Sequence, residues 1–382
     1  MRRLLLLVSA IVLLDTSFYA AITPLLPYYA EHEELTKTSA GVLAAAYPAG
    51  TMLASLPAGA IGARVGGKLM LAFGLSLLAL SSLTFGLAHS IVLLDAARFA
   101  QGIGGAVSWV GGMGLLSSAA PVERRAELMG TAFGAAAGGA LLGPVVGAIG
   151  RAAGPGPTFG AISSLAVALL VLVLREHVPA AAQAREPGGL AAAIRHPVIA
   201  RGAWLVGCTA LFFGVLDVLL PLQLAALGAA GGVIAGVFLA GAALEAGIAP
   251  LSGRYADRHG WVGPARAGLV AIAAMALVAS LPDSVALLGL VGVVAAPAVG
   301  VLWVPGLLLL GHGSDAAGLD HSYAYAVMNL LWAGSQAVGS AGGGALAEAT
   351  TDFVPYAIVA GIALATLATL TPRTRQPTAS SA

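Results

Sequence analysis

The sequence predicts an all-α membrane protein in which twelve transmembrane helices form two pseudo-symmetric bundles of six. Hydrophobic residues make up 59% of the 382 residues and charged residues only 9%, whereas a soluble domain carries about 25% charged residues. Apolar stretches of about 20 residues, the length that crosses a bilayer, recur along the whole chain. Similar loop segments begin at Gly59 and Gly253, about half the chain length apart, which indicates a duplicated architecture.

Twelve spans can be placed along the chain with short loops between them. The apolar character of the first span continues past the small residues Ala20 and Ala21 to Pro27, so we interpret it as a span and not as a cleaved signal peptide. Twelve spans use about 240 residues, which leaves no room for a sizeable domain outside the membrane. The expected spans are 4–27, 39–60, 69–88, 90–115, 127–149, 158–174, 202–225, 230–251, 264–281, 284–310, 321–347 and 353–371.

The longest loop lies between the sixth and seventh spans and separates the two predicted bundles. It contains Pro179, Pro187 and Pro197 among glycines and scattered charges, a composition typical of a linker. We therefore expect an N-terminal bundle at 1–175, a cytoplasmic linker at 176–200, a C-terminal bundle at 201–372 and a cytoplasmic tail at 373–382.

The distribution of basic residues predicts the orientation. With the N-terminus inside, fifteen basic residues fall on the cytoplasmic side, whereas only Lys37 and Arg151 fall outside. This asymmetry follows the positive-inside rule and places both termini in the cytoplasm. The excess of arginine over lysine, together with much alanine and glycine, fits a GC-rich bacterial genome, so we expect a multi-pass protein of the bacterial inner (plasma) membrane.

Two loops, each after the second span of its half, repeat a pattern of glycines and charges. The simplest interpretation is a tight basic turn that satisfies the positive-inside rule. The first copy has Ala63 where the second has Asp257. The pattern positions are Gly59, Arg64, Gly66 and Lys68 in the first copy, and Gly253, Asp257, Arg258 and Gly260 in the second.

The fourth span contains a cation at membrane depth. Arg98 lies about 12 Å into this span at 1.5 Å per residue, where an arginine must face a cavity or a partner. The alternative is that Arg98 snorkels and pairs with Asp95, one turn earlier. Gln101 and Gly102 follow in the same span, and the glycine there is first of all a packing position.

The fifth span combines closely spaced glycines with a proline. Gly139, Gly143 and Gly147 recur at four-residue spacing, which lets a neighbouring helix approach closely. Pro144 frees a backbone carbonyl and permits the helix to bend. Generic glycine packing would explain the spacing without any further role.

The first span carries the carboxylate of Asp15 about 16 Å from the inner surface, a depth similar to that of Arg98. Phe18 and Tyr19 lie three and four residues later, so we expect both rings on the same helical face as the carboxylate. A carboxylate beneath two aromatic rings suits an organic cation, through charge pairing and cation–π contact. The alternative is that Arg98 permanently neutralises Asp15 for stability.

Other polar positions occur in the second half. Asp217 in the seventh span and Glu245 in the eighth are ionisable at membrane depth, and each is a candidate for proton or substrate binding or for a structural pair. The eleventh span has a polar and aromatic face at helical spacing, suited to lining a cavity or to hydrogen bonding between helices. Its members are Tyr325, Asn329, Trp332 and Gln336.

These motifs resemble those of the major facilitator superfamily. The two loops are similar to its G-x-L-A-D-R-x-G-R-K signature, and Arg98 to Ala106 is similar to its fourth-helix motif R-x-x-Q-G-x-G-x-A. Gly139 to Gly147 is similar to the fifth-helix motif G-x-x-x-G-P-x-x-G of drug/proton antiporters. The spacing from Asp15 to the P-x-x-P at Pro24 and Pro27 resembles the first helix of vesicular amine transporters.

The resemblance implies roles for individual residues. The loop acid of the family caps a helix end in the opposite bundle and holds one gating state, so Asp257 is expected to cap the cytoplasmic start of the fifth helix near Glu127. Ala63 leaves the first copy without this acid. The fifth-helix motif implies export, and the first-helix acid, here Asp15, is tied to binding of substrate amines and protons.

We therefore expect a proton-coupled efflux transporter for small cationic or amphipathic molecules that works by alternating access. Its partners are the substrate, protons and the lipid bilayer, and we expect a monomer that binds neither cofactor nor nucleic acid. Gly62 to Leu69 resembles a phosphate-binding loop but lacks its Ser/Thr and its βαβ context. No enzymatic motif is present, and a single cysteine, Cys208, excludes a thiolate cluster. The alternatives are a sugar or metabolite permease of the same superfamily and a non-transporting membrane sensor.

Overall fold

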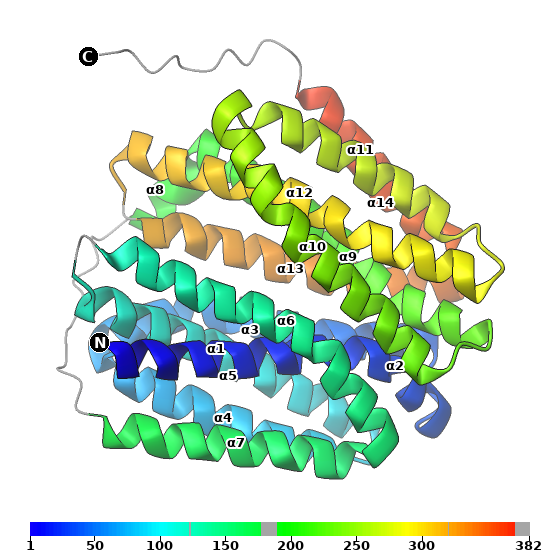
Figure 1. Ribbon diagram of the computed structural model, residues 1–382, viewed down its shortest axis with the longest axis horizontal. Coiled ribbons are helices and arrows are strands. Elements are labelled where there is room, and N and C mark those ends of the chain that lie inside the picture. Colours follow the sequence, from blue (N-terminus) through cyan, green and yellow to red (C-terminus); the bar gives the residue numbers. More distant parts are fainter. Residues whose placement is uncertain (122–123, 177–188, 320, 371–382) are drawn as a thin grey trace.

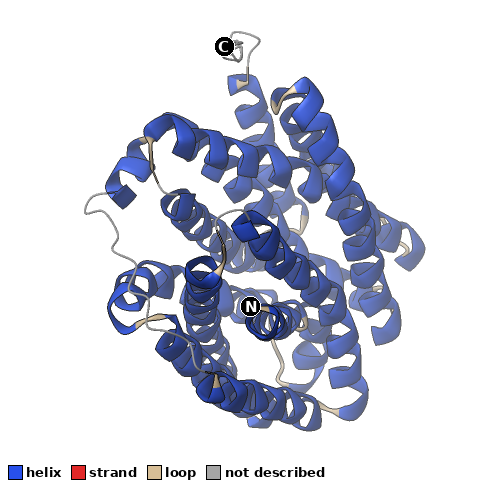
Figure 2. Cartoon of the chain, turned by 60° about the vertical axis from the view of Figure 1, so that its left-hand side comes forward, coloured by secondary structure: helices blue, strands red, loops and turns tan. Residues whose placement is uncertain are grey.

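The computed structural model describes residues 1–121, 124–176, 189–319 and 321–370, and these residues form helices joined by short loops, without strands (Figure 2). Nine helices of the described residues are long and apolar enough to cross a membrane, which agrees with the predicted class. The helices are α1 Arg2–Ala20, α2 Ile22–His32, α3 Lys37–Val65, α4 Gly67–Leu87, α5 Ile91–Ala119, α6 Arg125–Ala153, α7 Pro155–Arg175, α8 Gly189–Arg195, α9 Pro197–Ala226, α10 Gly231–His259, α11 Val262–Ala279, α12 Val285–Ala317, α13 His321–Ala349 and α14 Phe353–Thr369.

The helices run back and forth between two ends of the molecule (Figure 1). We call the end where α1 begins the inner end and the opposite end the outer end, following the predicted orientation. The helices α1 and α2 together make one crossing, α8 is a single short helix at the inner end, and each remaining helix makes one crossing. The described chain thus passes twelve times between the two ends, as expected from the sequence, and nine of its helices also have the length and hydropathy of a membrane span.

The first crossing is interrupted near its middle. Instead of one helix from 4 to 27, α1 ends at Ala20 and α2 continues from Ile22 to His32. Pro24 explains the interruption, because it has no amide hydrogen for the Ala20 carbonyl and its ring would clash with that carbonyl in a continuous helix. The crossing also extends five residues beyond the predicted end at Pro27, because Pro27 is tolerated inside α2.

The predicted linker contains ordered structure at its second end. Residues 177–188 lie outside the described part of the chain, but α8 follows them and packs on α13, where Tyr323 lies against Gly189. The next helix, α9, begins at Pro197, a favourable first helical residue, and so starts before the predicted boundary at 201.

Helix α6 packs closely along the interrupted first crossing through its glycines. A Cβ atom on Gly143 would lie 2.3 Å from the Ala20 Cβ, and one on Gly147 would lie 2.5 Å from the Pro24 ring. On Gly139 it would lie 2.5 Å from the Leu13 carbonyl oxygen. The spacing predicted from the sequence therefore corresponds to a real helix contact, which follows α1 across its break.

We expect Gly143→Leu to lower both the yield and the melting temperature of the purified protein, because α6 must move away from Ala20. Overpacking of this kind costs about 1–3 kcal/mol. Gly134→Leu in the same helix is the matched control, since nothing lies within 4 Å of a Cβ at Gly134. Equal melting temperatures for the two variants would contradict the packing role of Gly143.

The two bundles contact each other most closely toward their outer ends. In Figure 1, α6 and α10 meet at the right-hand side and separate toward the left, where the chain begins. At the outer end, Arg151 of α6 packs against Gly231 of α10. Helices α3 and α13 also meet there, with a Cβ on Gly41 only 2.5 Å from the Ser340 carbonyl oxygen.

Polar contacts hold the same outer ends together. The Lys37 ammonium at the start of α3 lies 2.6 Å from an Asp352 carboxylate oxygen, before α14. The other Asp352 oxygen accepts a hydrogen bond from the Gln223 amide of α9 at 3.1 Å, and the Thr38 amide donates to Glu348 at 2.7 Å. We call Lys37, Asp352 and Gln223 the outer clasp, because they join helices of both bundles.

Candidate functional site

The Asp15 carboxylate is buried inside the N-terminal bundle, with 1% of the residue exposed. The Tyr47 hydroxyl of α3 donates to the carboxylate, 3.0 Å from both of its oxygens. The Trp109 indole nitrogen of α5 donates to Oδ2, also at 3.0 Å. Two neutral donors from two helices therefore hold this carboxylate, and the structure shows no ion pair between it and a described basic side chain.

Helix α5 presents the residues of this site on one face. Arg98, Gln101, Gly105 and Trp109 follow at intervals of three and four residues, which places them above one another on a helix. Gly105 leaves the space that Asp15 needs, since a Cβ there would lie 2.7 Å from the carboxylate and 2.4 Å from the Tyr47 hydroxyl. A side chain at position 105 would therefore displace the carboxylate from its donors.

Arg98 is also fully buried, but it binds the backbone of the first crossing. Its guanidinium donates to the Phe18 carbonyl at 3.3 Å and to the Tyr19 carbonyl at 3.2 Å, and to the Gln101 side chain at 3.1 Å. These carbonyls lie next to the helix break at Ala21, where α1 stops. The predicted alternative of a snorkelling arginine paired with Asp95 is therefore not what the structure has.

Tyr47 connects the cation to the carboxylate. The Arg98 guanidinium carbon lies 5.1 Å from the centre of the Tyr47 ring, within cation–π distance, while the hydroxyl of the same ring is bonded to Asp15. The arrangement keeps the two opposite charges in the same bundle without a direct contact. Permanent neutralisation of Asp15 through an ion pair with Arg98 is thus not seen.

Tyr19 lies where the two bundles meet. Its ring packs on Tyr47 of the N-terminal bundle at 5.1 Å between ring centres, and on Trp332 of the C-terminal bundle at 5.8 Å. Its hydroxyl is hydrogen-bonded to the Gln336 amide on α13. Tyr19 therefore separates the Asp15 carboxylate, behind Tyr47, from the C-terminal bundle.

Phe18 occupies a different environment from Tyr19. It is completely buried and packs edge-on against Phe159 of α7 at 5.2 Å, and Phe159 packs in turn against Phe85 of α4. The prediction that both aromatic rings lie over Asp15 is thus wrong for Phe18. A helix turns by about 100° per residue, so the Phe18 ring points into the bundle core although Phe18 is adjacent to Tyr19 in the sequence. We do not propose a substrate contact for Phe18.

Asp217 and Glu245 lie on neighbouring helices of the C-terminal bundle. Asp217 lies on α9 and Glu245 on α10. Glu245 lies over Gly300 of α12, where a Cβ would be 2.9 Å from the Glu245 Cγ. Neither carboxylate forms a hydrogen bond or ion pair with another described residue, so they are not a structural pair with a cation.

The polar face of α13 extends from the bundle interface toward the inner end. Trp332 and Gln336 contact Tyr19, whereas Tyr325, two turns closer to the inner end, lines a cavity of about 380 Å³ with residues of α12. Asn329 lies between them and is half-buried. The cavity therefore lies on the inner side of the contact between Tyr19 and Trp332.

The repeated loop motifs have mainly structural contacts. Lys68 donates to the carbonyls of Leu174 and Glu176 at 2.9 and 2.6 Å and so caps the C-terminus of α7. Gly66 and Gly260 end α3 and α10 with positive φ angles of 84° and 85°, a conformation that favours glycine.

The expected cap by Asp257 is absent from this conformation. Asp257 is exposed and bonded to no described residue, and the side chain of Glu127 lies outside the described part of the structure. The remaining motif residues differ in environment. Arg64 and Arg258 are exposed and Gly253 has open space beside it, whereas Gly59 and Pro144 are buried. Gly102 packs against the Tyr47 carbonyl.

Sequence reasoning missed the two donors to Asp15. Tyr47 precedes Pro48 in a long apolar span, and a lone tyrosine at that depth was a usable signal. Trp109 was detectable from its spacing to Arg98 and Gln101 on one helical face. The outer clasp could not be found in this way, because Lys37, Asp352 and Gln223 lie in distant parts of the sequence.

We expect Arg98→Ala to reduce transport more strongly than Arg98→Lys. Removing the guanidinium leaves the carbonyls beside the break in the first crossing without their buried donor, which costs about 1–3 kcal/mol per group. Lysine keeps the charge but not the fork of donors. Initial transport rates, normalised to the amount of folded protein, distinguish the variants, and equal mild effects of both would contradict this role.

A sequence model of the Major Facilitator Superfamily matches residues 5–322 of the chain. The quinolone resistance protein NorA of Staphylococcus aureus (strain MRSA252) is 28% identical over 109 residues. This match covers 28% of the present chain and 28% of NorA, so it spans little more than a quarter of the relative's length. NorA from strain N315 of the same species matches to the same extent.

Solved structures resemble the fold over nearly its whole length. A bacterial homolog of the human lysosomal transporter Spinster, in an inward-facing and occupied conformation, has a TM-score of 0.72 at 14% identity and covers 97% of this chain and 94% of its own. A POT family transporter in complex with 5-aminolevulinic acid has a TM-score of 0.75 at 14% identity, with 97% and 95% covered. A variant of the nucleoside transporter NupG has 0.71 at 12% identity, with 96% and 98% covered. At these identities the likeness concerns the fold alone.

Proposed function

The chain belongs to the Major Facilitator Superfamily and is a membrane transporter and not an enzyme, and we propose that it exports small cationic or amphipathic molecules in exchange for protons. The observation that carries this proposal is the buried Asp15 carboxylate, which neutral donors hold and no described basic side chain pairs with. Such a carboxylate can take up either a proton or an organic cation. The distant relative of this chain, NorA, is a quinolone resistance protein, and this relationship favours export over uptake.

The proposed cycle begins from a conformation like the present one, in which the outer ends of the bundles are joined. Substrate reaches the cavity beside Tyr325 from the inner side and displaces the Tyr19–Gln336 contact. Its cation then replaces the proton on Asp15, with the Tyr19 and Trp332 rings beside it. Opening of the outer clasp releases the substrate outward, and a proton from outside resets Asp15.

The electrochemical gradient is sufficient for this exchange. Exchange of one proton for one monovalent cation moves no net charge, so the pH gradient drives it, and one pH unit supplies about 1.4 kcal/mol, or about a tenfold cation gradient. For a neutral substrate, the proton also gains roughly 2.3 kcal/mol across about 100 mV of membrane potential, which supports about a 50-fold gradient. We propose that Asp217 and Glu245 are further proton- or substrate-binding groups on the C-terminal side, since a buried carboxylate without a basic partner can take up a proton or pair with a cation. We also propose that the protein acts as a monomer in the bacterial inner membrane, with both termini in the cytoplasm.

A sugar or metabolite permease of the same superfamily is the second candidate. The polar and aromatic face of α13 favours it, because Trp332, Gln336 and Asn329 could bind a neutral polar substrate through stacking and hydrogen bonds. In that case substitutions on α13 would abolish transport, while Asp15→Asn would leave uptake intact. For the exporter, in contrast, Asp15→Asn abolishes transport.

Transport in inverted membrane vesicles tests the proposal. A panel of cationic, zwitterionic and neutral fluorescent compounds is offered with an imposed pH gradient, acid inside, and their accumulation is measured with and without an uncoupler. We expect accumulation of cationic compounds that the uncoupler abolishes. Substrate binding in reconstituted proteoliposomes without any flux would instead identify a sensor.

A further inference from the structure

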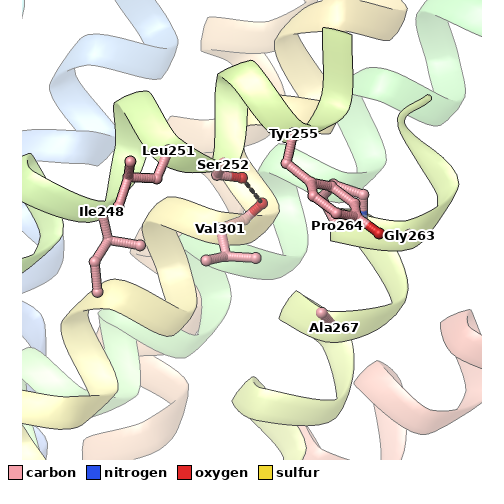
Figure 3. A pocket seen from close by; sticks show the side chains of 8 residues that line it. All are labelled: Ile248, Leu251, Ser252, Tyr255, Gly263, Pro264, Ala267 and Val301. Atoms are coloured by element: carbon pink, nitrogen blue, oxygen red, sulfur yellow. Dashed lines mark hydrogen bonds between the residues drawn. The ribbon is translucent and has the colours of Figure 1, made fainter. Parts of the chain in front are cut away.

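A lateral groove lies within the C-terminal bundle, away from Asp15, between α10, α11 and α12 (Figure 3). Its volume is about 320 Å³. Leu251 and Tyr255, which form one side of it, are 60% and 52% exposed, so the groove opens on the surface of the bundle. Its lining is otherwise apolar, with Ile248, Ala267, Pro264 and Val301 beside Gly263 and Ser252.

The sequence explains why the groove exists. Pro305 has no amide hydrogen for the Val301 carbonyl, four residues earlier in α12. The Ser252 hydroxyl of α10 donates to this carbonyl at 3.4 Å and so satisfies the polar group at the base of the groove (Figure 3). Across from it, Gly263 and Ala267 provide little side-chain volume on α11, so the space between the helices stays open.

The inner mouth of the groove is basic. The Tyr255 ring stacks on the His259 ring at 4.5 Å between ring centres, so one helical face of α10 runs from apolar residues through a tyrosine to a histidine. Arg258, the residue before His259, lies at the edge of this face. It is exposed and forms no hydrogen bond or ion pair with a described residue. The nearby Asp257 lies two residues from Tyr255, on the opposite side of the helix.

We propose that this groove binds one anionic phospholipid, with an acyl chain along Ile248 and Leu251 and the phosphate group at Arg258 and His259. Apolar walls open to the bilayer suit a hydrocarbon chain, and a tyrosine between an apolar and a charged zone is typical of the membrane–water interface. Basic residues at such a depth attract the anionic head groups of the adjoining leaflet. The positive end of the α11 dipole, at Val262 and Gly263, adds to this attraction. Lipid binding in this groove does not depend on which substrate the protein transports.

Native mass spectrometry of the purified full-length protein tests the site, with phosphatidylglycerol and phosphatidylcholine as probes. We expect the first phosphatidylglycerol to bind more tightly than the first phosphatidylcholine. Arg258→Gln should reduce this preference roughly fivefold, as expected for one basic residue near a membrane surface. Arg201→Gln is the matched control, because Arg201 is also exposed at the inner end but lies on α9, away from the groove.

A second variant tests the acyl chain. Ala267→Phe fills the groove from an exposed position and should weaken binding of the first phospholipid of either kind, whereas Ala274→Phe, exposed two turns further along α11 and outside the groove, should not. Melting temperatures of the four variants show whether each is folded. Equal binding of the two phospholipids by the unaltered protein, or equal effects of Arg258→Gln and Arg201→Gln, would overturn the proposal.

Discussion

Asp15→Asn is expected to reduce proton-driven export to the background level while the protein still folds. Asparagine has nearly the same size as aspartate and can still accept hydrogen bonds from Tyr47 and Trp109, so the packing around Gly105 is retained. It can neither take up a proton nor pair with an organic cation. The loss therefore concerns coupling and substrate binding and not stability.

Substrate-driven proton release measures this effect directly. In inverted vesicles with an acid interior, addition of substrate to the unaltered protein releases protons from the lumen, and a pH-sensitive dye records the release. Asp95→Asn is the matched control, because it makes the same chemical change in the same bundle, outside the contacts of Asp15. Proton-driven efflux that persists in Asp15→Asn would show that another carboxylate, such as Asp217, couples transport.

Tyr47, which donates a hydrogen bond to the Asp15 carboxylate, allows a second test of the same site. Tyr47→Phe removes one donor from the carboxylate but keeps the ring beneath Arg98, so the stabilisation of the charged form falls by the value of one charge-assisted hydrogen bond, about 1.5–3 kcal/mol. Because protonation then becomes easier, we expect the pH dependence of transport to shift toward higher pH. A profile identical to that of the unaltered protein would separate Tyr47 from proton binding.

The sequence predicted the fold because lipid imposes strong constraints on it. Apolar length gives the number of crossings, and the small residues at Gly139, Gly143 and Gly147 mark a close helix contact that the structure has. The exact ends of the helices were harder to predict from the sequence. The first crossing breaks at Ala21 and continues to His32, because Pro24 and Pro27 are consistent with either a short helix or two consecutive helices.

The candidate site was predictable in its charges but not in its contacts. Asp15 and Arg98 stand out because a charged side chain inside a bilayer costs free energy and is retained mainly for function. Their separation by Tyr47, however, depends on how α1, α3 and α5 meet. The same holds for Phe18 and Tyr19, whose rings point to different neighbours although they are adjacent in sequence. Helical periodicity assigns a residue to a face, whereas the neighbouring helix decides what that face contacts.

Asp352→Asn is expected to open the outer side of the molecule. The substitution removes the ion pair between Lys37 and Asp352, whose side chains are 39% and 24% exposed, and weakens the acceptor of the Gln223 hydrogen bond. An ion pair that is this exposed is worth about 1 kcal/mol or less, so the outward-open population should rise by up to about fivefold. Exchange of the two charges, Lys37→Asp with Asp352→Lys, should restore the original balance.

Labelling of a single cysteine reports this equilibrium. In a Cys208→Ser background, Ser340→Cys introduces a residue of similar size at a position that is 1% exposed and whose backbone carbonyl lies against Gly41 of the other bundle. A membrane-impermeant maleimide should react with it faster in Asp352→Asn, because opening of the outer ends separates α3 from α13. Glu31→Gln is the matched control, since it breaks an outer ion pair with Arg151 inside one bundle. If both substitutions change the labelling rate equally, the contacts between Gly41 and Ser340 hold the outer side closed, and the charges of the outer clasp do not.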